Sequence, residues 1–233
     1  MRRSLTFGRS IQLVAKRSWN LRRFVIWLTL ATALIVGQLD AGVDTDFFAR
    51  TAMSNVASYH FLEVVQTRGR LVLPDFGYVD FGHSNYRELF GGGGSVIYRS
   101  KCLTWIQEAY FVQAVGPAAK SATYIQPWTF VGYSIPHTKL VGQAVYFIYL
   151  PLNTVARIQH VLDRAKLEYE FSHFKLGAGY AGYKFDGSPW QSKPFLTCTL
   201  KTGRTGSFEF WAQRLPGNAW QAQLRYGITF KHK

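Results

Sequence analysis

The residues best suited to chemistry lie together in one short stretch, "DFGHSNYRE". It holds the compact group of acids, histidine and serine in this chain, namely Asp80, His83, Ser84 and Glu88. A serine hydroxyl becomes a nucleophile when a base lies within hydrogen-bond reach and a carboxylate orients that base. Hydrolysis is therefore one hypothesis for this stretch. The other hypothesis is a polar loop whose His83 and Asn85 fold a turn.

Four consecutive glycines, Gly91 to Gly94, follow almost directly. They do not form a phosphate-binding loop, because no Gly-Lys-Ser/Thr sequence follows them. Glycines inside a strand mark a bulge, a bend or a close approach of other groups. We expect this run to make room for large side chains, or to let the chain curl.

Metal and cofactor chemistry is not expected from this sequence. His60, His137, His160 and His173 are scattered without ligand spacing. The two cysteines, Cys102 and Cys198, form no Cys-x-x-Cys pair. The two cysteines are also expected on strands that are not neighbours, which argues against a disulfide bond.

The N-terminal segment has the features of an export signal. Residues 24–37 form an uncharged apolar run that follows two arginines. This run is shorter than the roughly 20 residues that a spanning helix needs. Residues 1–41 are therefore predicted to be a signal peptide or a retained signal anchor.

Composition narrows the class of protein further. The chain has 233 residues, of which 48% are hydrophobic and 16% aromatic, yet only 17% are charged. A mean hydropathy of −0.05 excludes a bundle of transmembrane helices. The net charge of +14 is partly carried by the N-terminal segment, and no dense Lys/Arg run remains in the rest. No nucleic-acid partner is therefore expected.

The last strand predicted from the sequence shows the clearest pattern. From Trp220 to Phe230, apolar and aromatic residues alternate with Gln221, Gln223 and Arg225. Eleven residues exceed the usual strand of about five or six, and they suit a tilted crossing of a bilayer. The apolar face is expected to contact lipid and the polar face to line a lumen.

Other polar residues are expected to share that lumen. Glu168 and Glu170 form a charged strand face with Lys166, and Arg157 and Arg164 are further lumen-facing candidates.

The same pattern predicts ten strands, joined by connections that alternate between longer and tighter. The stretch around residues 155–164 also fits a helix, and residues 42–75 mix helical and strand signals. The latter are expected to form a periplasmic or plug segment. The ten predicted strands cover residues 76–82, 89–99, 102–115, 121–134, 138–150, 156–171, 173–185, 194–202, 206–214 and 218–230.

Long amphipathic strands, alternating loop lengths and an aromatic last strand together resemble bacterial outer-membrane β-barrels. This resemblance implies an all-β, antiparallel transmembrane β-barrel of about eight to ten strands over residues 76–233. It also implies outer-membrane lipid and the barrel insertion machinery as partners. The interior of so small a barrel would be largely filled by side chains.

Three functions follow as hypotheses. The leading one is non-enzymatic, with a structural, adhesive or narrow-channel role in the bacterial outer membrane. The second is a lipid-modifying hydrolase, because the "HSN" triplet resembles the His-x-Ser-Asn motif of lipid A deacylases. Here, however, His83 and Ser84 are adjacent, and adjacent strand residues point to opposite faces. The third is a soluble periplasmic barrel that binds an apolar ligand and turns its aromatic faces inward.

Overall fold

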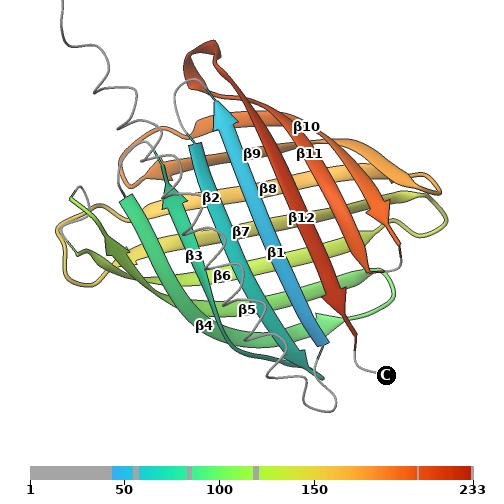
Figure 1. Ribbon diagram of the computed structural model, residues 1–233, viewed down its shortest axis with the longest axis horizontal. Coiled ribbons are helices and arrows are strands. Elements are labelled where there is room, and N and C mark those ends of the chain that lie inside the picture. Colours follow the sequence, from blue (N-terminus) through green and yellow to red (C-terminus); the bar gives the residue numbers. More distant parts are fainter. Residues whose placement is uncertain (1–43, 55–57, 83–85, 118–120, 204, 232–233) are drawn as a thin grey trace, which may run out of the picture. The chain divides into compact units, whose positions relative to one another are not determined.

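The computed structural model describes residues 44–54, 58–82, 86–117, 121–203 and 205–231. These residues form a closed barrel of twelve antiparallel strands, in which each strand pairs with its sequence neighbours and β1 pairs with β12 (Figure 1). The described part holds no helix long and apolar enough to cross a membrane. The strands are β1 (Asp44–Ser54), β2 (Ser58–Arg68), β3 (Leu71–Phe81), β4 (Tyr86–Arg99), β5 (Leu103–Val115), β6 (Thr123–Ser134), β7 (Leu140–Pro151), β8 (Gln159–Glu170), β9 (Phe174–Phe185), β10 (Gln191–Thr202), β11 (Gly206–Arg214) and β12 (Trp220–Phe230).

The predicted fold class is confirmed, but the predicted count of eight to ten strands is wrong. All ten predicted strands are present, and β1 and β2 come from the segment that was expected to be periplasmic or a plug. The expected boundary at residue 76 is wrong for the same reason, since the barrel begins at Asp44. Aromatic residues on the inward face of these strands, Phe48, Tyr59 and Phe61, hide the apolar–polar alternation.

The stretch for which a helix was the alternative is strand β8. Its register against both neighbours shifts near its middle, between Val145 and Tyr146 on β7 and between Leu162 and Ala165 on β8. Such a bulge places one extra residue in the strand and turns the residues beside it.

The two ends of the barrel differ in their connections. Asp44 of β1 pairs with Thr67 of β2, and its neighbour Thr45 pairs with Phe230 of β12. The first and last strands therefore begin and end at one end, where the turns at 69–70 and 171–173 also lie. The longer connections at 152–158 and 186–190 lie at the opposite end. In outer-membrane barrels the tight turns are periplasmic, so we name these ends inner and outer respectively.

Large apolar side chains cover the outward face of the wall. Leu196, Trp220 and Phe111 are 64%, 60% and 54% exposed respectively. The inward side chains of the same strands, such as Gln221 and Thr197, are buried. This arrangement suits a barrel in lipid and is the reverse of what the soluble periplasmic hypothesis requires.

Glycines stand opposite bulky inward side chains on the neighbouring strand. Gly92 pairs with Tyr110, and Gly94 pairs with Glu108. A Cβ atom on Gly92 would lie 2.1 Å from the carbonyl oxygen of Ala109, and one on Gly94 would meet the Cγ of Glu108 at 2.8 Å. Gly92 and Gly94 of the four-glycine run therefore make room for large side chains, in agreement with the expectation from sequence.

Candidate functional site in the barrel lumen

The lumen contains two chambers rather than a filled core. The outer chamber has a volume of about 490 Å³ and is bounded by Phe81, Arg157 and Phe185, close to the outer connections. The inner chamber has a volume of about 360 Å³ and is bounded by Phe48 and Lys175, toward the inner end. A filled interior was expected for eight to ten strands, and twelve strands enclose a wider space.

The two chambers meet at four residues that line both of them, Arg50, Phe61, Trp128 and Asp163. We call these four residues the eyelet. They come from β1, β2, β6 and β8, so strands far apart in the sequence build it together.

One carboxylate at the eyelet is shared by three arginines. Arg50 Nη1 lies 2.5 Å from Asp163 Oδ1, and Arg225 Nη2 lies 3.3 Å from Asp163 Oδ2. Arg164 also pairs with Asp163 Oδ2. Three cations against one anion leave the cluster with a net charge of +2. The bulge in β8 explains how the consecutive residues Asp163 and Arg164 both reach the lumen.

On the inner side of the eyelet, β8 to β11 carry a buried network of charges. Lys166 Nζ lies 2.9 Å from Glu168 and also pairs with Glu209. Thr197 and Thr199 donate hydrogen bonds of 2.9 Å and 2.8 Å to Glu209 and Glu168 respectively. Buried charges are tolerated when they are paired and hydrogen-bonded in this way.

The network also positions an arginine beside the eyelet. Trp211 Nε1 donates to Glu209 Oε1 at 2.5 Å, and the Trp211 ring stacks on Phe195 with centroids 3.8 Å apart. The guanidinium carbon of Arg225 lies 3.5 Å from the Trp211 ring centroid. We call the inward face of β8 to β12 and β1 the charged wall.

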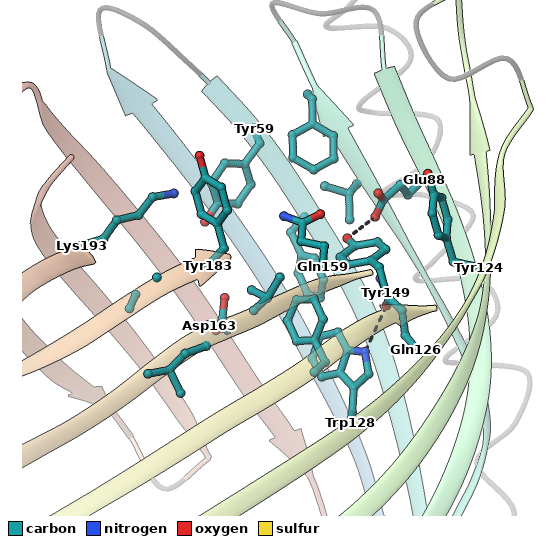
Figure 2. Close-up of a pocket in the computed structure, with 18 of the residues that line it drawn as sticks. Tyr59, Glu88, Tyr124, Gln126, Trp128, Tyr149, Gln159, Asp163, Tyr183 and Lys193 are labelled. Atoms are coloured by element: carbon teal, nitrogen blue, oxygen red, sulfur yellow. Dashed lines mark hydrogen bonds between the residues drawn. The ribbon is translucent and has the colours of Figure 1, made fainter. Parts of the chain in front are cut away.

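The inward face of β2 to β7 is different, and we call it the aromatic wall. Neighbouring rings contact one another from strand to strand, and Trp128 and Phe147 stack with centroids 4.2 Å apart. Trp128 Nε1 donates to Gln126 Oε1 at 3.0 Å, which holds the indole in place (Figure 2). The other centroid distances are 5.6 Å for Phe61–Phe90, 5.5 Å for Phe90–Tyr110 and 5.4 Å for Tyr110–Trp128.

Carboxylates on the aromatic wall are held by tyrosine hydroxyls. Glu88 accepts hydrogen bonds from Tyr86 at 3.0 Å and from Tyr149 at 2.8 Å. Asp75 accepts one from Tyr110 at 3.2 Å. Glu63 and Glu108 are further acidic residues on this wall, whereas arginines outnumber acids in the eyelet cluster.

The structure places the predicted lumen residues in the wall of the lumen. Gln221, Gln223, Arg225 and Glu168 are buried there. Glu170 continues the inward row of Glu168 at the inner rim, where it lies 2.7 Å from Lys201. Both described cysteines are free thiols.

The structure does not bring together the described members of the acid, histidine and serine group. His83 and Ser84 lie outside the described residues, as does the N-terminal segment 1–41. Asp80 lies on the outward face, 3.4 Å from Arg87, whereas Glu88 lies on the inward face. These two carboxylates are therefore separated by the wall. Among the described residues, no group of His, Cys, Asp and Glu is arranged to hold a metal ion.

Sequence reasoning missed the eyelet residues. Arg50 and Phe61 lie in the segment that was not assigned to the barrel, and Asp163 lies beside a bulge. The available signal was the alternating row of Asp44, Asp46 and Arg50, which fits the inward face of a strand.

No protein-family model matches the chain, and no curated protein matches its sequence. Solved structures are similar to it in fold. A KdgM porin in complex with disordered oligogalacturonate has a TM-score of 0.59 at 10% identity, over 81% of this chain and 99% of that chain. The chain folds as a bacterial outer-membrane β-barrel.

Two further structures support the same fold. The NanC porin has a TM-score of 0.53 at 10% identity, over 80% of this chain and 99% of that chain. The COG4313 outer membrane channel from Pseudomonas putida F1 has a TM-score of 0.53 at 11% identity, over 82% of this chain and 97% of that chain. This fold agrees with the outer-membrane localisation predicted from the sequence.

Proposed function

We propose that this protein is a narrow channel for small solutes across the bacterial outer membrane. The observation that carries the proposal is the pair of chambers, one toward each end of the barrel, that meet at the eyelet. The similar structures described as porins and as an outer membrane channel support it. The lumen residues supply the polar surface that a hydrated solute needs.

The two parts of the lumen have different tasks in this proposal. Arg50, Asp163, Phe61 and Trp128 restrict the size of what passes, because they narrow the path between the chambers. The three arginines around Asp163 favour solutes with negative charge at that point. Polar residues on both sides of the eyelet, among them Gln221 and Gln223 of the outer chamber, keep the path hydrated.

Conductance of single molecules in a planar bilayer tests the proposal. A cysteine placed in the lumen shows whether the current passes through the lumen. The variant Gln159→Cys puts a thiol in the outer chamber, and Leu196→Cys puts one on the lipid-facing surface. Both variants are made with Cys102→Ser and Cys198→Ser, which removes the native thiols.

A charged thiol reagent is expected to reduce the current through Gln159→Cys and to leave Leu196→Cys unchanged. The absence of conductance steps from the purified protein would contradict the proposal. Current that responds equally in both variants would show a path outside the lumen. The structural, adhesive and lipid A deacylase hypotheses remain predictions, and no described residue favours them over a channel.

A further inference from the structure

The outer chamber has two cations that no described carboxylate pairs with directly. Lys193 and Arg157 both line the chamber, and neither forms an ion pair within the described residues. The Lys193 ammonium lies 4.6 Å from the centre of the Tyr183 ring. The chamber's own carboxylates are already engaged, Asp163 by three arginines and Glu88 by two tyrosines. The two cations are therefore available to an incoming anion.

The opposite side of the same chamber is aromatic. Figure 2 shows Lys193 and Tyr183 on one side, and Trp128 and Tyr149 on the other. Trp128 stacks on Phe147 and its indole nitrogen is bound to Gln126, so its orientation is set before any ligand arrives. A preorganised aromatic surface binds with a smaller entropic cost than a mobile one.

We propose that the outer chamber is a saturable binding site for planar organic anions, of which aromatic carboxylates are the typical members. The inference rests on the proposed channel function and names the class of solute. The carboxylate is attracted to Lys193 and Arg157, and the ring lies against the aromatic side chains of the same chamber. Charge-assisted hydrogen bonds and ring contacts each add to affinity. The volume of about 490 Å³ falls within the range of small-molecule sites.

The carboxylates of the aromatic wall reinforce this orientation. Glu88 lies on the aromatic side, where its oxygens already accept hydrogen bonds from Tyr86 and Tyr149, so an anionic group finds its favourable partner at Lys193 instead (Figure 2). A hydrophilic anion such as a sugar acid interacts with the cations but makes no apolar contact with the rings. An apolar neutral ring uses the rings but leaves the cations unmatched.

Isothermal titration of the purified barrel in detergent tests the site, with benzoate and gluconate as probes. Both carry one carboxylate, and only benzoate carries a planar apolar ring. Benzoate is expected to bind saturably and roughly two- to tenfold more tightly than gluconate. Equal affinities, or no saturable binding of benzoate, would overturn the proposal.

Two variants locate the site, and each has a matched control. Trp128→Leu removes the ring, and Phe111→Leu removes a ring from the lipid-facing surface. Lys193→Gln removes the cation, and Lys139→Gln removes an exposed cation from an inner turn. The first member of each pair is expected to weaken benzoate binding roughly three- to tenfold. A control that weakens binding as strongly as its partner would overturn the assignment.

Conductance of the same preparation separates this inference from the proposed function. A protein that conducts but binds benzoate no better than gluconate would refute the inference and leave the channel intact. A protein that binds benzoate preferentially but shows no conductance would support the site and refute the channel.

Discussion

The charged wall and the aromatic wall line the same lumen but are stabilised differently. On the charged wall, Lys166 is bound between Glu168 and Glu209, and threonine hydroxyls complete the hydrogen bonding. On the aromatic wall, rings contact rings across five strands, from Phe61 to Phe147. Opposite charges pair on the charged wall, whereas on the aromatic wall rings contact rings and tyrosine hydroxyls bind the carboxylates.

Glycine supplies that space on both walls. Gly92 lies opposite Tyr110 on the aromatic wall, and Gly177 lies opposite Glu168 on the charged wall. A Cβ on either glycine would lie 2.1 Å from a carbonyl oxygen of the neighbouring strand. The walls therefore differ in the chemistry of their large side chains and share the way in which those side chains are accommodated. Four measurements test this comparison.

The largest effect is expected from Lys166→Met on the charged wall. It leaves Glu168 and Glu209 buried without their cation, and breaking such a pair costs about 3–5 kcal/mol of stability. Urea unfolding in lipid vesicles, followed by tryptophan fluorescence, measures the loss. Neutralising both acids in the same chain, as Glu168→Gln and Glu209→Gln, is expected to restore part of it. A loss below about 1 kcal/mol would mean that the network does not hold this wall together.

On the aromatic wall, Gly92→Ala is expected to cost about 1–3 kcal/mol, because the added methyl group meets backbone atoms that cannot move aside. Gly132→Ala on β6 is the matched control, since its nearest neighbour is a side-chain atom, in the ring of Phe130 at 3.3 Å, and not the backbone. The same unfolding assay compares them. Equal stabilities for the two variants would contradict the role assigned to the glycine run.

Where the walls meet, Asp163→Asn removes the one carboxylate that three arginines share. A unit charge about 4 Å from an ion in water contributes about 1 kcal/mol, so anion-over-cation permeability is expected to rise roughly fivefold. Reversal potentials in 0.1 M salt measure this ratio, and the rise is expected to shrink at about 1 M, where the Debye length is about 3 Å. The outward-facing Asp80→Asn serves as control and is expected to have no effect.

The smallest effect is expected at the inner rim of the charged wall. Lys201 lies 2.7 Å from Glu170, and both side chains are about one-third exposed to water. An exposed pair of this kind contributes less than about 1 kcal/mol. Lys201→Met is therefore expected to leave the unfolding midpoint nearly unchanged. A loss as large as that of Lys166→Met would show that burial does not distinguish the two pairs.

Much of the fold was predictable because the outward face of each strand carries its own signal. In β12, Trp220 and Leu224 face lipid while Gln221 and Gln223 face the lumen, and this alternation is local to eleven residues. In β1 and β2 the signal is weaker, because Phe48 and Phe61 face inward beside Arg50 and Glu63, so large apolar side chains occur on both faces. The strand count was too low for that reason.

By itself, the sequence determined the class of this protein. Lipid requires an apolar outward face along every strand, and this requirement produces an alternation that is visible within the sequence of a single strand. Only the tertiary structure decided the eyelet and the two walls. Arg50 and Trp128 line the same passage because β1 closes on β12 and the barrel curves, and Asp163 enters the lumen because β8 bulges. Neither closure nor bulge is a property of one strand, so no pattern within a strand predicts them.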